Sequence, residues 1–446
     1  MRKLRTLIAT IGAAAVIAIS GTGVLAAPAE LSSPAADLRV ALNRLLSEHA
    51  SLAMEAMREG VDTGDLSDPE FTAVAGALAG NTDDLTAAIE SVYGTDAGDA
   101  FRAQWEAHIG FFVDYTVGVA TDDDAAKQSA LDDLAGYRED FAGFLDAATE
   151  GGLPADAAAD ALAMHVDQLI SQIDLYAAGD YAGAYAAARE AYAHMGMTAD
   201  ALALAIIQQD PDTFSGNSLA WSPAVDLQIA LDLLLSEHAI VAIEAMRNGF
   251  SGAADFEASA NALAANTDDL TAAIESVYGA DAGAAFRTQW EAHIGFFVDY
   301  TVALAGDNEA GQQAALDELA GYREDFAAFL DGATDGNAPA GPVSDALQAH
   351  VDQLIGALNA FAEGDFEGAY AAEREASAHM FMTGQVLAAA IAGQFPDRFP
   401  TTPMPSDTAM ARPEPGTSPA VLIGLALASV AAVSLTRRAI EVRSHG

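Results

Sequence analysis

One segment of the chain occurs twice, and this repetition limits the folds available to the protein. Residues Trp105–Val117 return unchanged as Trp290–Val302, 185 positions later. A second shared string, Leu46–His49, returns as Leu235–His238 at a spacing of 189. A period this long indicates duplication of a whole domain rather than a solenoid of short repeats. The chain has 446 residues, more than one ordinary helical core needs, so two homologous domains are expected.

Each copy has the composition and spacing of an α-helical domain. Stretches rich in alanine, leucine and acidic residues are separated by breaks such as Gly94-Thr95-Asp96 and Gly151-Gly152-Leu153-Pro154, which are typical helix-stop and N-cap signals. Sustained strand-like alternation of β-branched residues is missing. Long amphipathic helices with short connections predict an all-α fold, with an up-and-down bundle of about six helices in each copy. In the first copy we predict helices at residues 35–60, 69–93, 96–121, 123–149, 155–178 and 180–209.

The domain boundaries follow from the limits of the repeat. The first bundle repeat is expected at residues 33–214 and the second at residues 222–399. The linker between them is marked by Gly216, Asn217 and Ser218, which are residues typical of turns and breaks.

The start of the chain predicts export across a membrane. Residues 1–26 have the layout of a signal peptide, because Arg2, Lys3 and Arg5 precede an apolar stretch at 7–19. The small residues that follow suit cleavage near position 26. We therefore expect the mature protein to lie outside the cytoplasm.

The end of the chain predicts a membrane anchor. Residues 419–436 form an uncharged apolar run long enough to cross a bilayer as a transmembrane helix. A segment rich in Pro, Thr and Ser at 400–418 has the composition of a stalk. The basic residues in 437–446 place that tail in the cytoplasm by the positive-inside rule. The bulk of the chain would then face outward at the cell surface.

This tail resembles the C-terminal sorting signal of surface proteins that sortases anchor. Such signals combine a Leu-Pro-x-Thr-Gly motif, an apolar span and a basic end. The string Met404-Pro405-Ser406-Asp407-Thr408-Ala409 stands at the motif position, with Met for Leu, Ala for Gly and one extra residue between Pro and Thr. The resemblance implies attachment at the cell surface, and a plain membrane anchor is the interpretation that we adopt.

The charge and the cysteine count exclude several classes of function. The formal net charge is −46, and such a surface repels nucleic acid and anionic lipid. The acidity indicates either a solubility adaptation, as in high salt, or a field that concentrates cations near the protein. The chain contains no cysteine, which excludes disulfides, thiolate metal sites, iron–sulfur clusters and covalent haem attachment.

Histidines occupy predicted core positions in both copies. His108 lies on the helical stripe of Trp105, Phe112 and Tyr115, where a leucine would ordinarily pack. Burying an imidazole without a partner costs about 1–3 kcal/mol. Converging imidazoles on facing helices are how helical bundles build metal and haem sites. The four candidate ligands of each copy are His49, His108, His165 and His194, and His238, His293, His350 and His379.

These histidines predict a transition-metal site in each copy. Without thiolates the available ligands are imidazole, carboxylate and thioether, and the nearby methionines favour copper among the metals that imidazole binds. Glu190 and Glu375 each precede a histidine by four residues, on the same helical face. The possible accessory ligands are Glu190, Glu375, Met57, Met246, Met197 and Met382.

The leading hypothesis is therefore an exported, membrane-anchored protein that binds metal ions for storage, buffering or sensing, without catalysis. One alternative is a structural or interaction module whose histidines make hydrogen bonds in the core. Another is a redox bundle that holds haem non-covalently between two histidines. The sequence contains no Glu-x-x-His pair, no His-Glu-x-x-His motif and no Gly-rich phosphate loop, which argues against di-iron, zincin and nucleotide sites. It identifies no protein partner.

Overall fold

The structure, a computed structural model, describes residues 31–402, and all regular secondary structure in this range is helical. The predicted all-α class is therefore confirmed for the described residues. The first six helices, which we call the first bundle, are α2 (Pro34–Thr63), α3 (Pro69–Tyr93), α4 (Thr95–Ala120), α5 (Asp124–Ala148), α6 (Ala155–Ala177) and α7 (Tyr181–Gln209). The largest difference from the predicted bounds is three residues, at the end of α2.

A short helix, α8 (Asn217–Ala220), joins the first bundle to six further helices. These form the second bundle: α9 (Pro223–Ser251), α10 (Phe256–Tyr278), α11 (Ala280–Ala305), α12 (Glu309–Ala333), α13 (Ala340–Ala362) and α14 (Phe366–Gln394). The turn before α8 needs the glycine at position 216. Its φ is 82°, and an added Cβ would lie 2.5 Å from the Ser33 side chain.

The predicted signal peptide (1–26), most of the stalk (400–418), the transmembrane helix (419–436) and the cytoplasmic tail (437–446) lie outside the described residues. Within residues 31–402, no helix is both long and apolar enough to cross a membrane.

Local sequence signals explain where the longest helices begin and end. Ser33 and Ser222 are the N-caps of α2 and α9; each accepts a hydrogen bond from a first-turn backbone N–H, and each precedes a proline at the first helical position. Gly64 and Gly252 end the same two helices in the left-handed conformation. The two helices are thus delimited by equivalent residues.

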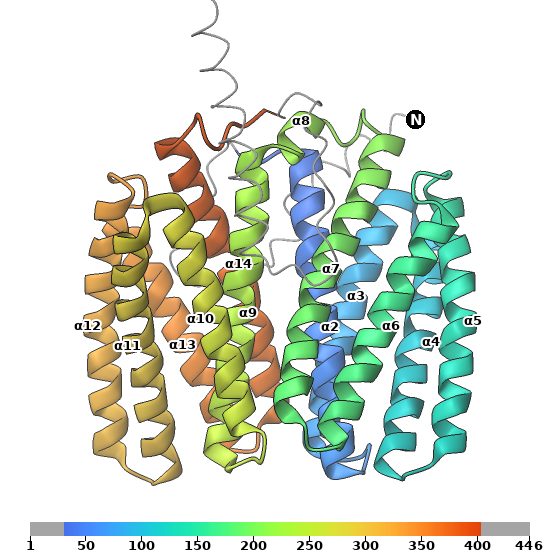
Figure 1. Ribbon diagram of the computed structural model, residues 1–446, viewed down its shortest axis with the longest axis horizontal. Helices are drawn as coiled ribbons and strands as arrows, with labels where there is room; N and C mark the ends of the chain where they lie inside the picture. The colour runs from blue at the N-terminus through green and yellow to red at the C-terminus, as the bar shows by residue number, and fades with distance from the viewer. Residues whose placement is uncertain (1–30, 403–446) are drawn as a thin grey trace, which may run out of the picture.

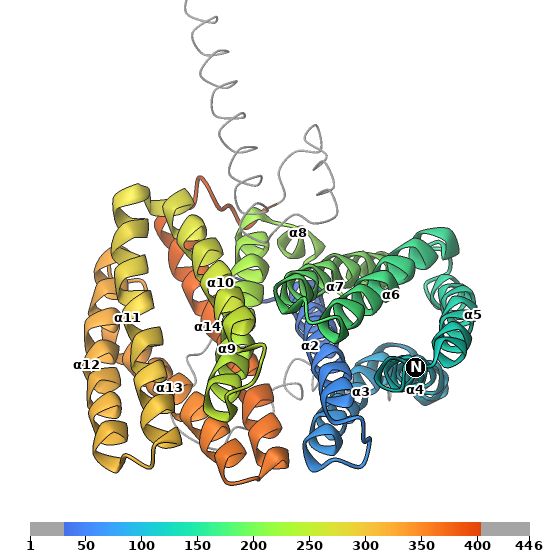
Figure 2. The same ribbon diagram turned by 60° about the horizontal axis from the view of Figure 1, so that its bottom comes forward.

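The two bundles stand side by side, and consecutive helices run up and down within each (Figure 1). The turned view shows that α4, α5 and α6 curve around one outer side of the molecule, while α11, α12 and α13 form the other (Figure 2). Helices α2 and α9 lie at the centre, where each packs on its own bundle and faces the other. Both central helices are therefore buried on nearly all sides.

Charged side chains cross the boundary between the central helices in reciprocal pairs. Arg58 of α2 binds Glu244 of α9, and Arg247 of α9 binds Glu55 of α2 with 2.6 Å between Nη2 and Oε2. Arg247 also lies 3.0 Å from Glu373 of α14. All five side chains are buried. Removing one partner from such a pair leaves an uncompensated buried charge, so these contacts fix how the bundles meet.

A second pair of arginines, on α14 and α7, extends this network beyond the central helices. Arg374 of α14 donates to Glu48 of α2 at 2.8 Å and to Asp84 of α3 at 2.8 Å. Arg189 of α7 donates in the same way to Glu237 of α9, at 2.9 Å. Glu48 and Glu237 each precede a candidate histidine in the sequence. Each bundle therefore holds the carboxylate next to a candidate ligand of the other bundle.

One arginine at the boundary has no counterpart in the repeat. Arg39 donates to Asp200 and to Asp226, at 2.8 and 2.7 Å, and its guanidinium lies 4.2 Å from the centre of the Trp221 ring. It thereby ties the start of α9 and the linker to the first bundle. The equivalent position of α9, 189 residues later, is Gln228.

Candidate metal centre

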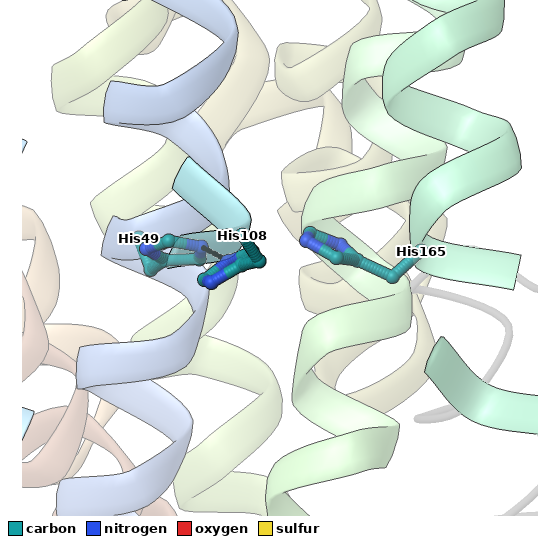
Figure 3. Close-up of side chains that lie close together, drawn as sticks. All are labelled: His49, His108 and His165. Atoms are coloured by element: carbon teal, nitrogen blue, oxygen red, sulfur yellow. Dashed lines mark hydrogen bonds between the residues drawn. The ribbon is translucent and has the colours of Figure 1, made fainter. Parts of the chain in front are cut away.

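Three histidines meet in the middle of the first bundle. His49 lies on α2, His108 on α4 and His165 on α6, and their side chains point toward one another (Figure 3). Nε2 of His49 lies 3.3 Å from Nε2 of His108. One ring nitrogen from each histidine lies within 4.8 Å of the other two. All three side chains are buried.

The second bundle repeats this group with His238 on α9, His293 on α11 and His350 on α13. The Nε2 atoms of His293 and His238 are 3.4 Å apart, and the three ligand nitrogens again lie within 4.8 Å of one another. In the sequence repeat, His238 corresponds to His49, His293 to His108 and His350 to His165. The same geometry thus arises from both copies of the sequence.

Aromatic rings surround the first histidine group. The Trp105 ring centre lies 4.6 Å from those of both His49 and His108. Tyr137 stacks on His108 at 4.9 Å, with only 12° between the ring planes. In the second bundle, Tyr322 stacks on His293 at 5.0 Å. These apolar surfaces exclude water and fix the orientation of the imidazoles.

Burial keeps the imidazoles uncharged. It lowers the pKa of His108 and His165 to about 3, and it lowers the pKa of His49 well below its usual value. In the second bundle burial lowers the pKa of His293 to about 3, and that of His350 well below its usual value. A neutral imidazole has a free lone pair on one nitrogen, which is the form that binds metal ions.

The hydrogen bonds of these rings are incomplete. Two neutral imidazoles 3.3 Å apart share one N–H, so only one of the two rings, His49 or His108, donates to the other. Within the described part of the chain, His165 has no hydrogen-bond partner at either ring nitrogen, and neither has His350. Buried polar atoms in native proteins are nearly always paired, so each unpaired group calls for an explanation such as a bound ion.

The fourth predicted histidine of each copy does not join the group. His194 on α7 donates from Nε2 to the backbone carbonyl of Ala161 on α6, at 3.0 Å. His379 on α14 does the same to Ala346 on α13, at 3.0 Å. Each of these carbonyls lies about one turn before the histidine that α6 or α13 contributes to the group. The structure thus brings together three of the four predicted ligands in each bundle.

The predicted accessory ligands are distributed unevenly. Glu190 and Glu375 are exposed, so they do not contribute to either histidine group. Met197 and Met382 are half-buried, and each lies three residues, less than one helical turn, after the fourth histidine of its copy. Met57 is buried and lines a cavity of about 20 Å³ together with His49 and His108.

Met246 is also buried, in the core of the second bundle. The small cavity beside Met57 has room for about one water-sized species. Among the six accessory candidates, Met57 is the one that shares a cavity lining with two of the proposed ligands, His49 and His108.

Several residues around the site were not predicted from the sequence. Tyr137 and Tyr322 belong to the shared string Ala-Gly-Tyr-Arg-Glu-Asp-Phe, but nothing in that string indicates a ring stacked on histidine. Asn81 donates to Glu48 at 2.8 Å and to the backbone carbonyl of Leu45 at 3.0 Å. The signal that was available is the recurrence of Asn81 as Asn266, which makes the equivalent bond to Glu237.

The group has the dimensions of a small-ion site. A metal ion bound at about 2.0–2.1 Å by two imidazole nitrogens holds them roughly 3.3–3.6 Å apart in tetrahedral or trigonal geometry. The observed Nε2–Nε2 distances are 3.3 and 3.4 Å. A ring nitrogen of the third imidazole lies within 4.8 Å of the other two. No carboxylate belongs to either group among the described residues.

No family model matches the chain, and neither does a curated protein or a solved structure.

Proposed function

We propose that each bundle binds one transition-metal ion through three histidines: His49, His108 and His165 in the first, and His238, His293 and His350 in the second. The observation that carries this proposal is the convergence of three buried, neutral imidazoles, one of which has no hydrogen-bond partner. It occurs at equivalent positions of both repeats, which we interpret as homologous domains produced by duplication. A bound ion would satisfy the free lone pairs of all three rings.

We propose copper in its monovalent state as the preferred ion. The imidazoles are neutral and no carboxylate joins them, so a bound ion would keep its full charge in apolar surroundings. The free energy of burying an ion increases with the square of its charge, which favours a monovalent over a divalent ion. Copper has an accessible monovalent state among the metals that imidazole commonly binds, and the thioether of Met57 is a ligand of suitable softness nearby.

The two other hypotheses fit the arrangement less well. Core hydrogen bonding accounts for His194 and His379, which donate to backbone carbonyls. It does not account for His165, whose two nitrogens have no partner. Haem between His49 and His108 is disfavoured because 3.3 Å between their Nε2 atoms leaves no space for a porphyrin plane.

The setting that we propose is the outer face of a membrane. It is supported by the signal-like composition of residues 1–26 and by the apolar run at 419–436. The strongly negative surface would raise the local concentration of cations. The role that we propose from these features is storage, buffering or sensing of metal at the cell surface, without a catalytic step.

The proposal is tested by metal retention. The full chain is loaded with copper(I) under reducing conditions, desalted and analysed for metal by mass spectrometry, with zinc(II) as a parallel arm. Two copper equivalents per chain are expected. The double variant His165→Ala/His350→Ala should retain none, because each site then has only two imidazoles.

The matched control is His194→Ala/His379→Ala, which alters the histidines outside the two groups and should still retain two equivalents. The proposal fails if the wild-type chain retains no metal and its melting temperature is unchanged by copper. Retention of two zinc but no copper equivalents would contradict the choice of ion only.

A further inference from the structure

The second bundle contains a cavity of about 90 Å³ in the half where α10 ends and α11 begins. Its floor lies in the middle of the bundle and includes His293, His350 and His379. Its far end lies at the turn between α10 and α11, where Tyr278 contributes to the lining. A void of this size in a packed core is unusual, because natural interiors contain few spaces larger than a water molecule.

The lining contains no charged residue. The other lining side chains are aliphatic or aromatic, apart from one methionine and two threonines, and the aromatic ones carry two tyrosine hydroxyls and the indole N–H of Trp290. Apolar cavities of this kind exclude water and accept apolar molecules. The cavity therefore suits a molecule without charge or extended hydrogen-bonding capacity.

The shape of the cavity suits a chain rather than a compact molecule. Along α12 the lining extends from Tyr322 to Thr334, which are 12 residues apart and so roughly 18 Å apart at about 1.5 Å of helix rise per residue. A volume of about 90 Å³ spread over that length leaves a narrow channel. An unbranched alkyl chain has the matching length and cross-section.

Hydrogen bonds lie beside the far end of the cavity. The Tyr278 hydroxyl donates to Oε1 of Gln394 at 2.8 Å, and Nε2 of Gln394 donates to the backbone carbonyl of Ala333 at 3.0 Å. Together these bonds link the ends of α10, α14 and α12. Tyr278 lines the cavity, and both side chains are half-buried, so these hydrogen bonds lie beside this end of the cavity and partly at the protein surface.

The described chain leaves the second bundle at this same end. The carbonyl of Pro400 accepts a hydrogen bond from Ala224 at the start of α9, and Arg398 donates to the carbonyl of Val277 beside Tyr278. The apolar run at 419–436 follows fewer than 20 residues later in the sequence. The Tyr278 end of the cavity is thus the end at which the described chain stops, before the apolar run in the sequence.

We propose that this cavity binds the unbranched alkyl chain of an uncharged lipid or alcohol, which enters tail first between Tyr278 and Gln394 and reaches the histidine floor. The strongly negative protein surface disfavours a fatty-acid carboxylate at the mouth. The alkyl chain is held by burial of its methylene groups against the aliphatic and aromatic lining. This site goes beyond the proposed metal binding and does not depend on it.

The test uses Trp290, which lies in the cavity lining. In the full chain carrying Trp105→Phe and Trp221→Phe, Trp290 is the sole tryptophan. The protein is freed of metal with EDTA and titrated with 12-bromo-1-dodecanol, whose terminal bromine quenches tryptophan on contact. We expect a saturable loss of Trp290 emission, reversed by excess 1-dodecanol and not by dodecanoate.

Cavity-filling variants show where the alcohol binds. Ala346→Phe, and the smaller change Ala346→Leu, extend a lining side chain into the channel. Each should abolish the quenching and raise the melting temperature, whereas a misfolded variant would lower it. Quenching that is unsaturable, or unchanged in both filled variants, overturns the proposal, and so does tighter binding of dodecanoate than of dodecanol.

The hydrogen bonds at this end are tested with a matched pair. Gln394→Ala should increase the rate of quenching in stopped-flow mixing. Gln209→Ala removes the equivalent bonds to Tyr93 and Ala148 in the first bundle and should leave the Trp290 rate unchanged. Equal rates in wild type and Gln394→Ala would show that the chain does not enter at this end. Because all these measurements use metal-free protein, their failure is distinct from failure of metal binding.

Discussion

The histidine groups and the boundary between the bundles are both buried and polar. They differ in whether the buried groups have partners within the chain. At the boundary, Arg58 and Arg247 each have a carboxylate partner within the chain. In the histidine group, neither ring nitrogen of His165 has a hydrogen-bond partner among residues 31–402. The comparison teaches that burial alone does not indicate function. At the boundary each of these buried charges has an opposite charge within the chain, whereas the histidine group presents ring nitrogens that have no hydrogen-bond partner among the described residues.

Of the changes that test this comparison, a change of pH should have the largest effect on the free energy of unfolding. In metal-free protein the unfolded-state imidazoles take up protons near pH 6.5, whereas His108, His165 and His293 have folded-state pKa values of about 3. Between these values the unfolded state binds more protons, so stability falls as the pH falls. Each histidine contributes a slope of about 1.4 kcal/mol per pH unit, and the three together about 4.

Urea unfolding between pH 7 and pH 4 measures this slope. The control is the metal-free variant His165→Leu/His350→Leu, which should show a shallower decline over the same range. Equal slopes in the two proteins would mean that the histidine groups do not determine acid sensitivity.

The boundary should respond most to loss of an arginine. Arg247→Ala leaves Glu55 and Glu373 buried without their counter-charge, so the free energy of unfolding should fall by about 3–5 kcal/mol. Chemical denaturation checks this. Arg287→Ala, which removes a partly exposed arginine paired with Asp268 and Glu291, is the matched control and should cost less than about 1 kcal/mol. Similar losses of unfolding free energy in both variants would show that the buried charge pairs at the boundary contribute no more than exposed ones.

Substitution of the fourth histidine should have an intermediate effect on stability. His194→Leu removes the donor to the Ala161 carbonyl and should cost about 1–3 kcal/mol in metal-free protein, because that carbonyl then lacks its side-chain partner. Copper stoichiometry should be unchanged. A variant with full stability would indicate that the hydrogen bond contributes nothing to the fold.

The smallest change in stability is expected at His165, where the direction of the change distinguishes a ligand from a structural residue. His165→Leu replaces an unpaired buried imidazole by an apolar side chain of similar size, so metal-free protein should be stabilised by about 1 kcal/mol or left unchanged. The same substitution should abolish copper retention by the first bundle. A loss of more than about 2 kcal/mol would show that His165 is structural, like His194.

The sequence predicted the helices well and their mutual orientation poorly. Glycine, proline and capping residues place helix ends from local information, which is why α2 was predicted to end within three residues of Thr63. The phase of His108 among Trp105 and Phe112 likewise predicted its burial. Phase on one helix says nothing about the rotation and height of the next, so the sequence did not distinguish His165, which joins the group, from His194, which does not.

The boundary between the bundles was missed for a related reason. An amphipathic helix shows one apolar stripe, and the charged residues on its other face are ordinarily solvated. Glu55 and Arg58 lie on that second face of α2, and the packing of α9 and α7 around it buries them. Their recurrence as Glu244 and Arg247 was the available signal, because reciprocal partners in a duplicated chain carry both charges in each copy.

The reciprocal arginines give the molecule the architecture of a symmetric dimer whose two subunits share one polypeptide. In a dimer of identical chains every substitution appears on both sides, and assembly depends on concentration. In a single chain neither constraint holds, and the two halves already differ, with Arg39 in one and Gln228 in the other. If each half holds one ion, independent mutation gives the two sites separate affinities. One molecule then responds to metal over a wider concentration range than two identical sites allow.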